Sequence, residues 1–116
     1  MEENFVSYEI ALALKQLGFD EECLGIYYGD GILSYDYDPE MYSSSLPAPL
    51  YQQAFKFFRE KYNLHYIIYK NINMDGYDFC EITNDGITNI NNFKTYEEAQ
   101  IQCLIKLIEV CKKIKL

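Results

Sequence analysis

The chain has 116 residues, 49% of them hydrophobic, and a formal net charge of −8. This is a usual length for one domain, and the hydrophobic fraction excludes a disordered polymer. No apolar run approaches the roughly 18–20 residues of a membrane helix, and the acidic residues 1–4 do not resemble a secretory signal. We expect a single globular domain over residues 1–116 that is cytoplasmic and does not associate with a membrane.

The charge is unevenly distributed along the chain. Residues 1–40 hold ten acids and one base, Lys15, whereas residues 41–116 hold eight acids and nine bases. Because the acidic N-terminal part of the chain repels phosphate, the charge distribution argues against nonspecific nucleic-acid binding. Two readings stay open for the acids: a solvated surface that keeps the protein soluble, or a patch for a basic partner.

The first predicted element is a helix over residues 7–17. Ser7 can cap its N-terminus. Gly18 followed by Phe19 predicts a left-handed stop, with the apolar ring folded back onto the last turn. One apolar stripe recurs at helical spacing, formed by Val6, Ile10, Leu14 and Leu17.

A hairpin follows, with arms over residues 24–28 and 32–37. The arms are short, aromatic and β-branched, and they flank the turn Gly29-Asp30-Gly31. Residues 39–48 are expected to form a surface loop.

The second predicted helix begins with Pro49 at its first position and stops at Asn63. Its apolar face consists of Tyr51, Ala54, Phe55, Phe58 and Tyr62. Two strands are then expected, over residues 65–70 and 77–83. Residues 84–93 are expected to be an Asn-rich loop, with a short edge strand as the alternative.

The last helix has a capping box, in which Thr95 caps the start and Glu98 reaches back to the amide of Thr95. The predicted order is therefore α-β-β-α-β-β-α. This order indicates an α+β fold in which three helices pack on an antiparallel sheet of about four strands.

The residues needed for catalysis are sparse. His65 is the one histidine, so a histidine-rich metal site is impossible. A nucleophilic pair would require the side chains of His65 and Cys80 to lie next to each other on adjacent strands. A histidine on a strand beside aromatic residues more often has a structural role. The four cysteines, at positions 23, 80, 103 and 111, match no zinc or redox spacing and are expected to be free, mostly buried thiols.

Other motifs also favour structural readings. Asp36, Asp38 and Glu40 alternate as in a calcium loop but lack its glycine and its terminal glutamate, so we expect no metal site. We also expect no cofactor, because no Lys-Ser/Thr follows the glycines near residue 29. A basic and aromatic neighbourhood is the remaining candidate for weak single-strand binding. It consists of Lys56, Arg59, Lys61, Lys70, Tyr62, Tyr66 and Tyr69.

Three stretches, residues 5–19, 48–62 and 95–109, together resemble small hypothetical proteins encoded by phages and prophages of gut Bacteroidetes. The first runs Phe5-Val6-Ser7-Tyr8-Glu9, the second Ala48-Pro49-Leu50-Tyr51, and the third Thr95-Tyr96-Glu97-Glu98-Ala99. The strands depart from that pattern, because Phe or Tyr stands where tryptophan is typical. The resemblance implies a phage accessory or virion-associated role in a bacterial cytoplasm, and it assigns no functional residue.

These patterns predict a non-enzymatic accessory protein that acts by protein–protein interaction, as a host-takeover or anti-defence adaptor. Its partner is expected to be another protein or a second copy in a homo-oligomer. The predicted contact residues are Tyr27, Tyr28, Tyr35, Tyr37, Asp36, Asp38 and Glu40. The alternatives are a virion structural or cargo protein, an acidic DNA mimic or weak single-strand binder, and a small enzyme or ligand-binding domain.

Overall fold

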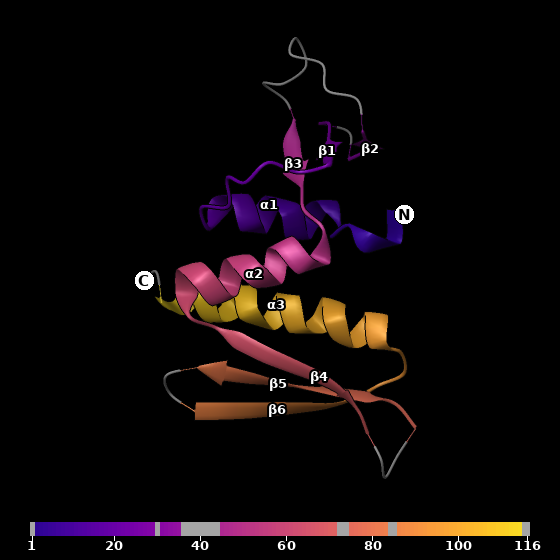
Figure 1. The fold of residues 1–116 in the computed structure, drawn as a ribbon, viewed down its shortest axis with the longest axis vertical. Helices are drawn as coiled ribbons and strands as arrows, with labels where there is room; N and C mark the ends of the chain where they lie inside the picture. Colours follow the sequence, from indigo (N-terminus) through magenta and orange to yellow (C-terminus); the bar gives the residue numbers. More distant parts are fainter. Residues whose placement is uncertain (1, 30, 36–44, 72–74, 84–85, 115–116) are drawn as a thin grey trace. The chain divides into compact units, whose positions relative to one another are not determined.

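The structure, a computed structural model, describes residues 2–29, 31–35, 45–71, 75–83 and 86–114 (Figure 1). The chain divides into two compact units, Met1–Lys56 and Phe57–Leu116. Whether residues 1–116 behave as the single domain expected from their length stays a prediction.

The first unit combines a helix with a small antiparallel sheet (Figure 1). A 3-10 turn, η1 (Glu2–Asn4), precedes α1 (Tyr8–Gln16). The sheet has the strand order β2-β1-β3. Its strands are β1 (Gly25–Tyr27), β2 (Leu33–Ser34) and β3 (Leu46–Ala48).

The predicted first helix and its ends are confirmed. The Ser7 hydroxyl accepts a hydrogen bond from the Ile10 amide at 3.3 Å. Gly18 adopts the left-handed φ of 103° that ends the helix. The Phe19 amide then donates to the Leu14 carbonyl at 2.9 Å, and the Phe19 ring is buried.

The predicted hairpin is confirmed in a shorter form, because β1 pairs with β2 over two residues on each side. The surface loop predicted over residues 39–48 is wrong at its end, where β3 lies, and its residues 39–44 lie outside the described residues. Leu46 and Ala48 are buried on one face, which makes this segment an edge strand paired with β1. Pro47 is tolerated there, since an edge strand has one side without ladder bonds.

α2 (Tyr51–Tyr62) leads from the first unit into the second. The carbonyl of Leu50 accepts the first helical bond, so the prediction that placed Pro49 inside the helix is wrong by two positions. The Gln53 side chain caps this start by accepting from the Leu50 amide at 3.0 Å. Asn63, with a left-handed φ of 54°, ends α2 as predicted.

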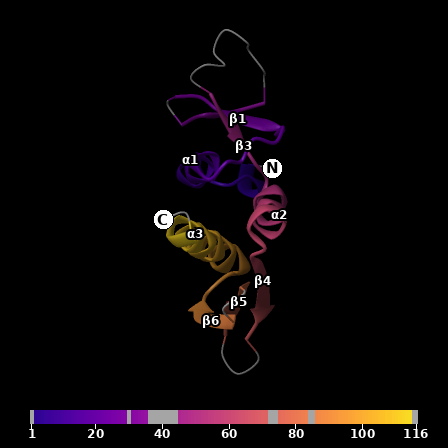
Figure 2. The ribbon, with the colours of Figure 1, turned by 90° about the vertical axis from the view of Figure 1, so that its left-hand side faces the viewer.

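The second unit is a three-stranded antiparallel sheet with a long helix over one face. Its strand order is β4-β5-β6, and its strands are β4 (His65–Lys70), β5 (Tyr77–Thr83) and β6 (Gly86–Phe93). Figure 2 shows α3 (Tyr96–Ile114) lying over this sheet. The Glu98 amide donates to the Thr95 hydroxyl at 3.0 Å, which confirms the predicted cap.

The pleat gives this sheet two unlike faces. The register pairs Tyr66 with Glu81 and Ile68 with Phe79, and this side packs under α3. The opposite side is called the open face. It consists of His65, Ile67, Tyr69, Asp78, Cys80, Ile82, Ile87 and Asn89.

The α+β class is confirmed, and so is the alternation of helices with antiparallel strands. The strands are distributed differently from the prediction, which placed about four in one sheet. The described residues form two sheets of three strands, because β3 joins the first hairpin and β6 joins β4 and β5. No described helix is both long enough and apolar enough to cross a membrane.

Candidate functional site

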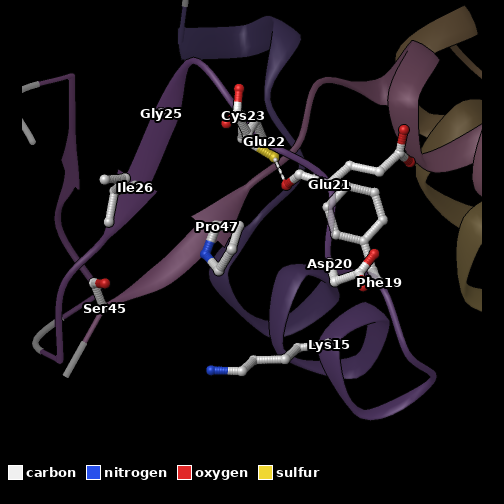
Figure 3. Close-up of a pocket in the computed structure, with 10 residues that line it drawn as sticks. All are labelled: Lys15, Phe19, Asp20, Glu21, Glu22, Cys23, Gly25, Ile26, Ser45 and Pro47. Atoms are coloured by element: carbon white, nitrogen blue, oxygen red, sulfur yellow. Dashed lines mark hydrogen bonds between the residues drawn. The ribbon is translucent and has the colours of Figure 1, made fainter. Parts of the chain in front are cut away.

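The first unit contains a cleft of about 550 Å³, within the usual 300–1,000 Å³ of small-ligand sites (Figure 3). Three parts of the unit supply its walls: the end of α1, the segment that leads to β1, and the β1 and β3 strands. The lining residues are Lys15, Phe19, Asp20, Glu21, Glu22, Cys23, Gly25, Ile26, Ser45 and Pro47.

The acidic segment of the cleft is held in place from both ends. At one end, the left-handed Gly18 turns the chain back so that Phe19 is buried against α1. At the other, the Gln53 side chain donates from Nε2 to the Glu22 carbonyl at 3.0 Å. Because Gln53 also caps α2, one amide side chain joins the acidic segment to a helix start.

The lining of the cleft combines acidic residues with the apolar Phe19, Ile26 and Pro47. The carboxylates of Asp20, Glu21 and Glu22 are exposed and have no ion-pair or hydrogen-bond partner among the described residues. Lys15 is the one cation among the lining residues. Pro47 lies among the lining side chains in Figure 3. Such a surface suits a ligand with a positive head and an apolar stem, as in lysine or arginine side chains.

Cys23 is the one thiol among the lining residues, and it is held in its neutral form. Its Sγ donates to the Glu21 carbonyl at 3.4 Å. Burial, together with the nearby Glu21 carboxylate, raises the pKa of Cys23 to about 11. Because the thiolate is the nucleophilic form, this position has little nucleophilic character at neutral pH.

The predicted contact tyrosines occupy different environments. Tyr27 is 8% exposed, its hydroxyl donates to the Val6 carbonyl, and its ring meets Tyr8 edge-on at 5.7 Å. It is therefore a core residue of the first unit, where sequence alone suggested a surface contact. Tyr28 is half-buried in the hairpin turn, and Tyr35 is 49% exposed beside Phe5.

The other predicted contact residues, Tyr37, Asp36, Asp38 and Glu40, lie outside the described residues. The acids that line the cleft are a different set, located between α1 and β1. The sequence signal for them was present, since Asp20, Glu21 and Glu22 directly follow a helix stop. Nothing in their spacing revealed that β3 would complete a cleft beside them.

No family model, curated protein or solved structure matches this chain. The cleft and the charges around it therefore carry the functional argument.

The second unit holds a buried carboxyl group between its sheet and α3. Glu81 is 2% exposed, and its Oε1 has no hydrogen-bond partner among the residues that the structure describes. Burial raises the pKa of Glu81; Lys106 opposes that change and Glu109 adds to it. Burial, with Glu81 nearby, also raises the pKa of Cys103 to about 12. Both acidic groups are thus biased toward their neutral forms.

His65 and Cys80 share the open face on neighbouring strands, with Ile82 opposite His65 and Ile67 opposite Cys80. The His65 ring nitrogen Nε2 lies 3.1 Å from the Asn63 side-chain oxygen. Cys80, Cys103 and Cys111 are buried, Cys23 is half-buried, and none of these four described cysteines forms a disulfide. The expectation of free, mostly buried thiols is confirmed.

The predicted basic and aromatic neighbourhood makes contacts within the second unit. The Lys61 ammonium lies 5.6 Å from the Phe57 ring centroid, and the Lys70 ammonium lies 5.3 Å from that of Tyr77. These cations are already stacked on rings of their own chain, which leaves less of them for a nucleic acid base. Among the described residues, no group of three or more side chains is arranged to hold a metal ion.

Proposed function

We propose that this chain is a non-enzymatic interaction protein whose first unit binds a basic segment of another protein. The observation that carries the proposal is the cleft of about 550 Å³, lined by three exposed carboxylates that have no partner within the part of the chain that the structure describes. A partner's lysine or arginine would place its cation against Asp20, Glu21 and Glu22. Its methylene stem would then lie along the apolar lining.

The charge pattern along the chain supports this choice of partner. The ten acids in residues 1–40 give the first unit an attractive field for cations, which steers encounter and raises the association rate. The raised pKa values of Cys23 and Cys103 support a binding role over nucleophilic chemistry. The bacterial cytoplasm and the phage accessory role remain part of the proposal, on the resemblance of the three helical stretches alone.

The proposal is tested by affinity capture from a bacterial lysate with three forms of the full chain. The first is the wild type, and the second is the cleft variant Asp20→Asn/Glu21→Gln/Glu22→Gln. The third is the control variant Glu60→Gln/Glu97→Gln/Glu109→Gln. It also removes three negative charges, but from exposed positions of the second unit.

We expect a stoichiometric partner with a basic segment to be retained by the wild type and the control variant, and to be lost from the cleft variant. A partner that all three forms retain equally would refute the assignment of the cleft. A wild type that captures nothing above background would refute the interaction role.

A further inference from the structure

The two sheets of the described residues have four edge strands, which differ in how they are protected against pairing. β2 has two residues, β3 contains Pro47 and β4 ends in Lys70. Short length, proline and lysine are the usual devices that stop an edge strand from recruiting another strand. β6 has eight residues and contains no charged residue and no proline.

β6 is also accessible along its first half. Gly86, Thr88 and Asn89 are exposed, and Ile87 is 66% exposed. β5 occupies one side of β6, and no other described strand pairs with its outer side. An edge strand presents a row of backbone donors and acceptors along that outer side.

The second half of β6 is protected by a bulge. The pairing register shifts between Tyr77 and Phe79, and Asn92 adopts a left-handed φ of 76°. The buried Asp78 carboxylate accepts from the Asn92 amide at 3.0 Å, which fixes this bulge. A bulge twists an edge away from pairing, so the accessible edge is residues 86–90.

We infer that residues 86–90 of β6 pair antiparallel with the same residues of a second copy, which joins two sheets into one of six strands. A second copy matches this segment, because antiparallel pairing about a two-fold axis places the backbone donors of one copy opposite the acceptors of the other. Two chains of net charge −8 repel one another over most of their surface, whereas β6 carries no charge. A two-fold axis through β6 would bring this uncharged segment against itself.

The pairing should be weak and dependent on concentration. A five-residue edge supplies few hydrogen bonds and buries less area than the roughly 800 Å² per partner of a standard interface. The dimer is independent of the proposed cleft, which lies in the first unit, so either assignment can fail without the other.

The test uses sedimentation velocity of the full chain from about 1 μM to about 1 mM, a range that covers weak complexes. The wild type should shift toward a dimer as its concentration rises. Asn89→Glu and Asn89→Lys each place like charges near the two-fold axis. Each should raise the dissociation constant of the dimer roughly fivefold or more. A mixture of the two variants should recover the dimer, because opposite charges then meet.

Gln52→Glu and Gln52→Lys are the matched controls, since Gln52 is an exposed amide on α2, and neither should change the association. Circular dichroism verifies that each variant is folded. Amide hydrogen exchange within residues 86–90 should slow as the wild-type concentration rises.

Three results would overturn the inference. A wild type that stays monomeric over the whole concentration range would exclude a second copy as the partner of β6. The partner of this edge would then be an extended segment of a different protein. A dimer insensitive to both Asn89 variants would place the interface elsewhere. A mixture of the Asn89 variants that fails to re-associate would exclude a two-fold axis at β6.

Discussion

Glu81 shows how one residue can make stability depend on pH. Its side chain is 2% exposed, its Oε1 has no hydrogen-bond partner in the described part of the chain, and burial raises the pKa of Glu81 above its ordinary value. The neutral acid is therefore favoured by folding. Its contribution is fully present below the ordinary pKa of a glutamate and is lost as pH rises through the raised pKa.

We expect Glu81→Gln to leave the free energy of unfolding nearly unchanged at acidic pH and to raise it by about 1 kcal/mol at pH 8. The amide cannot ionise, so it avoids the cost of a buried charge. Urea unfolding at the two pH values measures the difference. A variant that is equally destabilised at both pH values would show that the buried carboxyl is fully compensated, with Lys106 as a cation that acts on it.

Gly76 is the position where a side chain would be least tolerated. Its φ is 147°, and an added Cβ would lie 2.6 Å from the backbone oxygen of Phe93. Gly86 has a comparable φ of 130° with nothing within 4 Å of such a Cβ. A substitution at Gly76 therefore causes both a steric clash and backbone strain, whereas a substitution at Gly86 causes backbone strain alone.

We expect Gly76→Ala to lower the free energy of unfolding by about 3 kcal/mol, because backbone must move as well as adopt a strained φ. Gly86→Ala should cost about 1 kcal/mol, from strain alone. Denaturant titration of both variants provides the measurement. Equal losses would mean that the contact with Phe93 relaxes freely.

At the scale of the element, the β-bulge of β6 depends on one carboxylate. Asp78 is 4% exposed and accepts from the Asn71 side chain at 2.8 Å and from the Asn92 amide at 3.0 Å. It therefore joins the end of β4 to the bulge of β6. Both donors would lose this partner if the carboxylate were removed.

We expect Asp78→Ala to lower the free energy of unfolding by about 2 kcal/mol, since two polar groups lose their partner. Hydrogen exchange should locate the loosening at Asn92 before the rest of β6. Asp75→Ala, an exposed acid outside the strands, is the control and should change little. Unaltered exchange at Asn92 would show that the bulge holds without Asp78.

Elements with local signals were predictable from the sequence. Ser7, Gly18, Asn63 and Thr95 mark helix ends by their own chemistry, and β4 and β5 follow simple alternation. β6 was harder to identify because the bulge changes its period. Ile90 and Phe93 lie three positions apart and yet both line the α3 side, so the alternation of the strand breaks between them.

The cleft was beyond prediction for a related reason. Its acids lie next to one another in the sequence, but its far wall comes from Ser45 and Pro47, about twenty residues away. Only the pairing of β3 with β1 brings the two segments together. Tyr27 illustrates the converse error, since a residue chosen as a surface contact is a core side chain with a satisfied hydroxyl.

Across the whole molecule, charged residues are distributed unevenly along the chain, and both proposed interactions depend on this distribution. The acids concentrate in residues 1–40, whereas the uncharged β6 strand lies in the second unit. The first arrangement attracts cations, and the second permits a like-charged copy to approach. The two have opposite responses to salt. Screening, with a Debye length of about 8 Å at physiological ionic strength, should weaken the first and favour the second.

The most direct test of the central claim is an NMR titration of the isotope-labelled full chain with an oligolysine peptide. Its acetylated, uncharged counterpart is the control peptide. Amide signals of residues 20–23 should shift with oligolysine alone, salt should reduce these shifts, and Asp20→Asn/Glu21→Gln/Glu22→Gln should abolish them. Glu60→Gln/Glu97→Gln/Glu109→Gln should preserve the shifts at residues 20–23. The account would be contradicted if the wild type showed no shifts there, or if both triple variants reduced them equally.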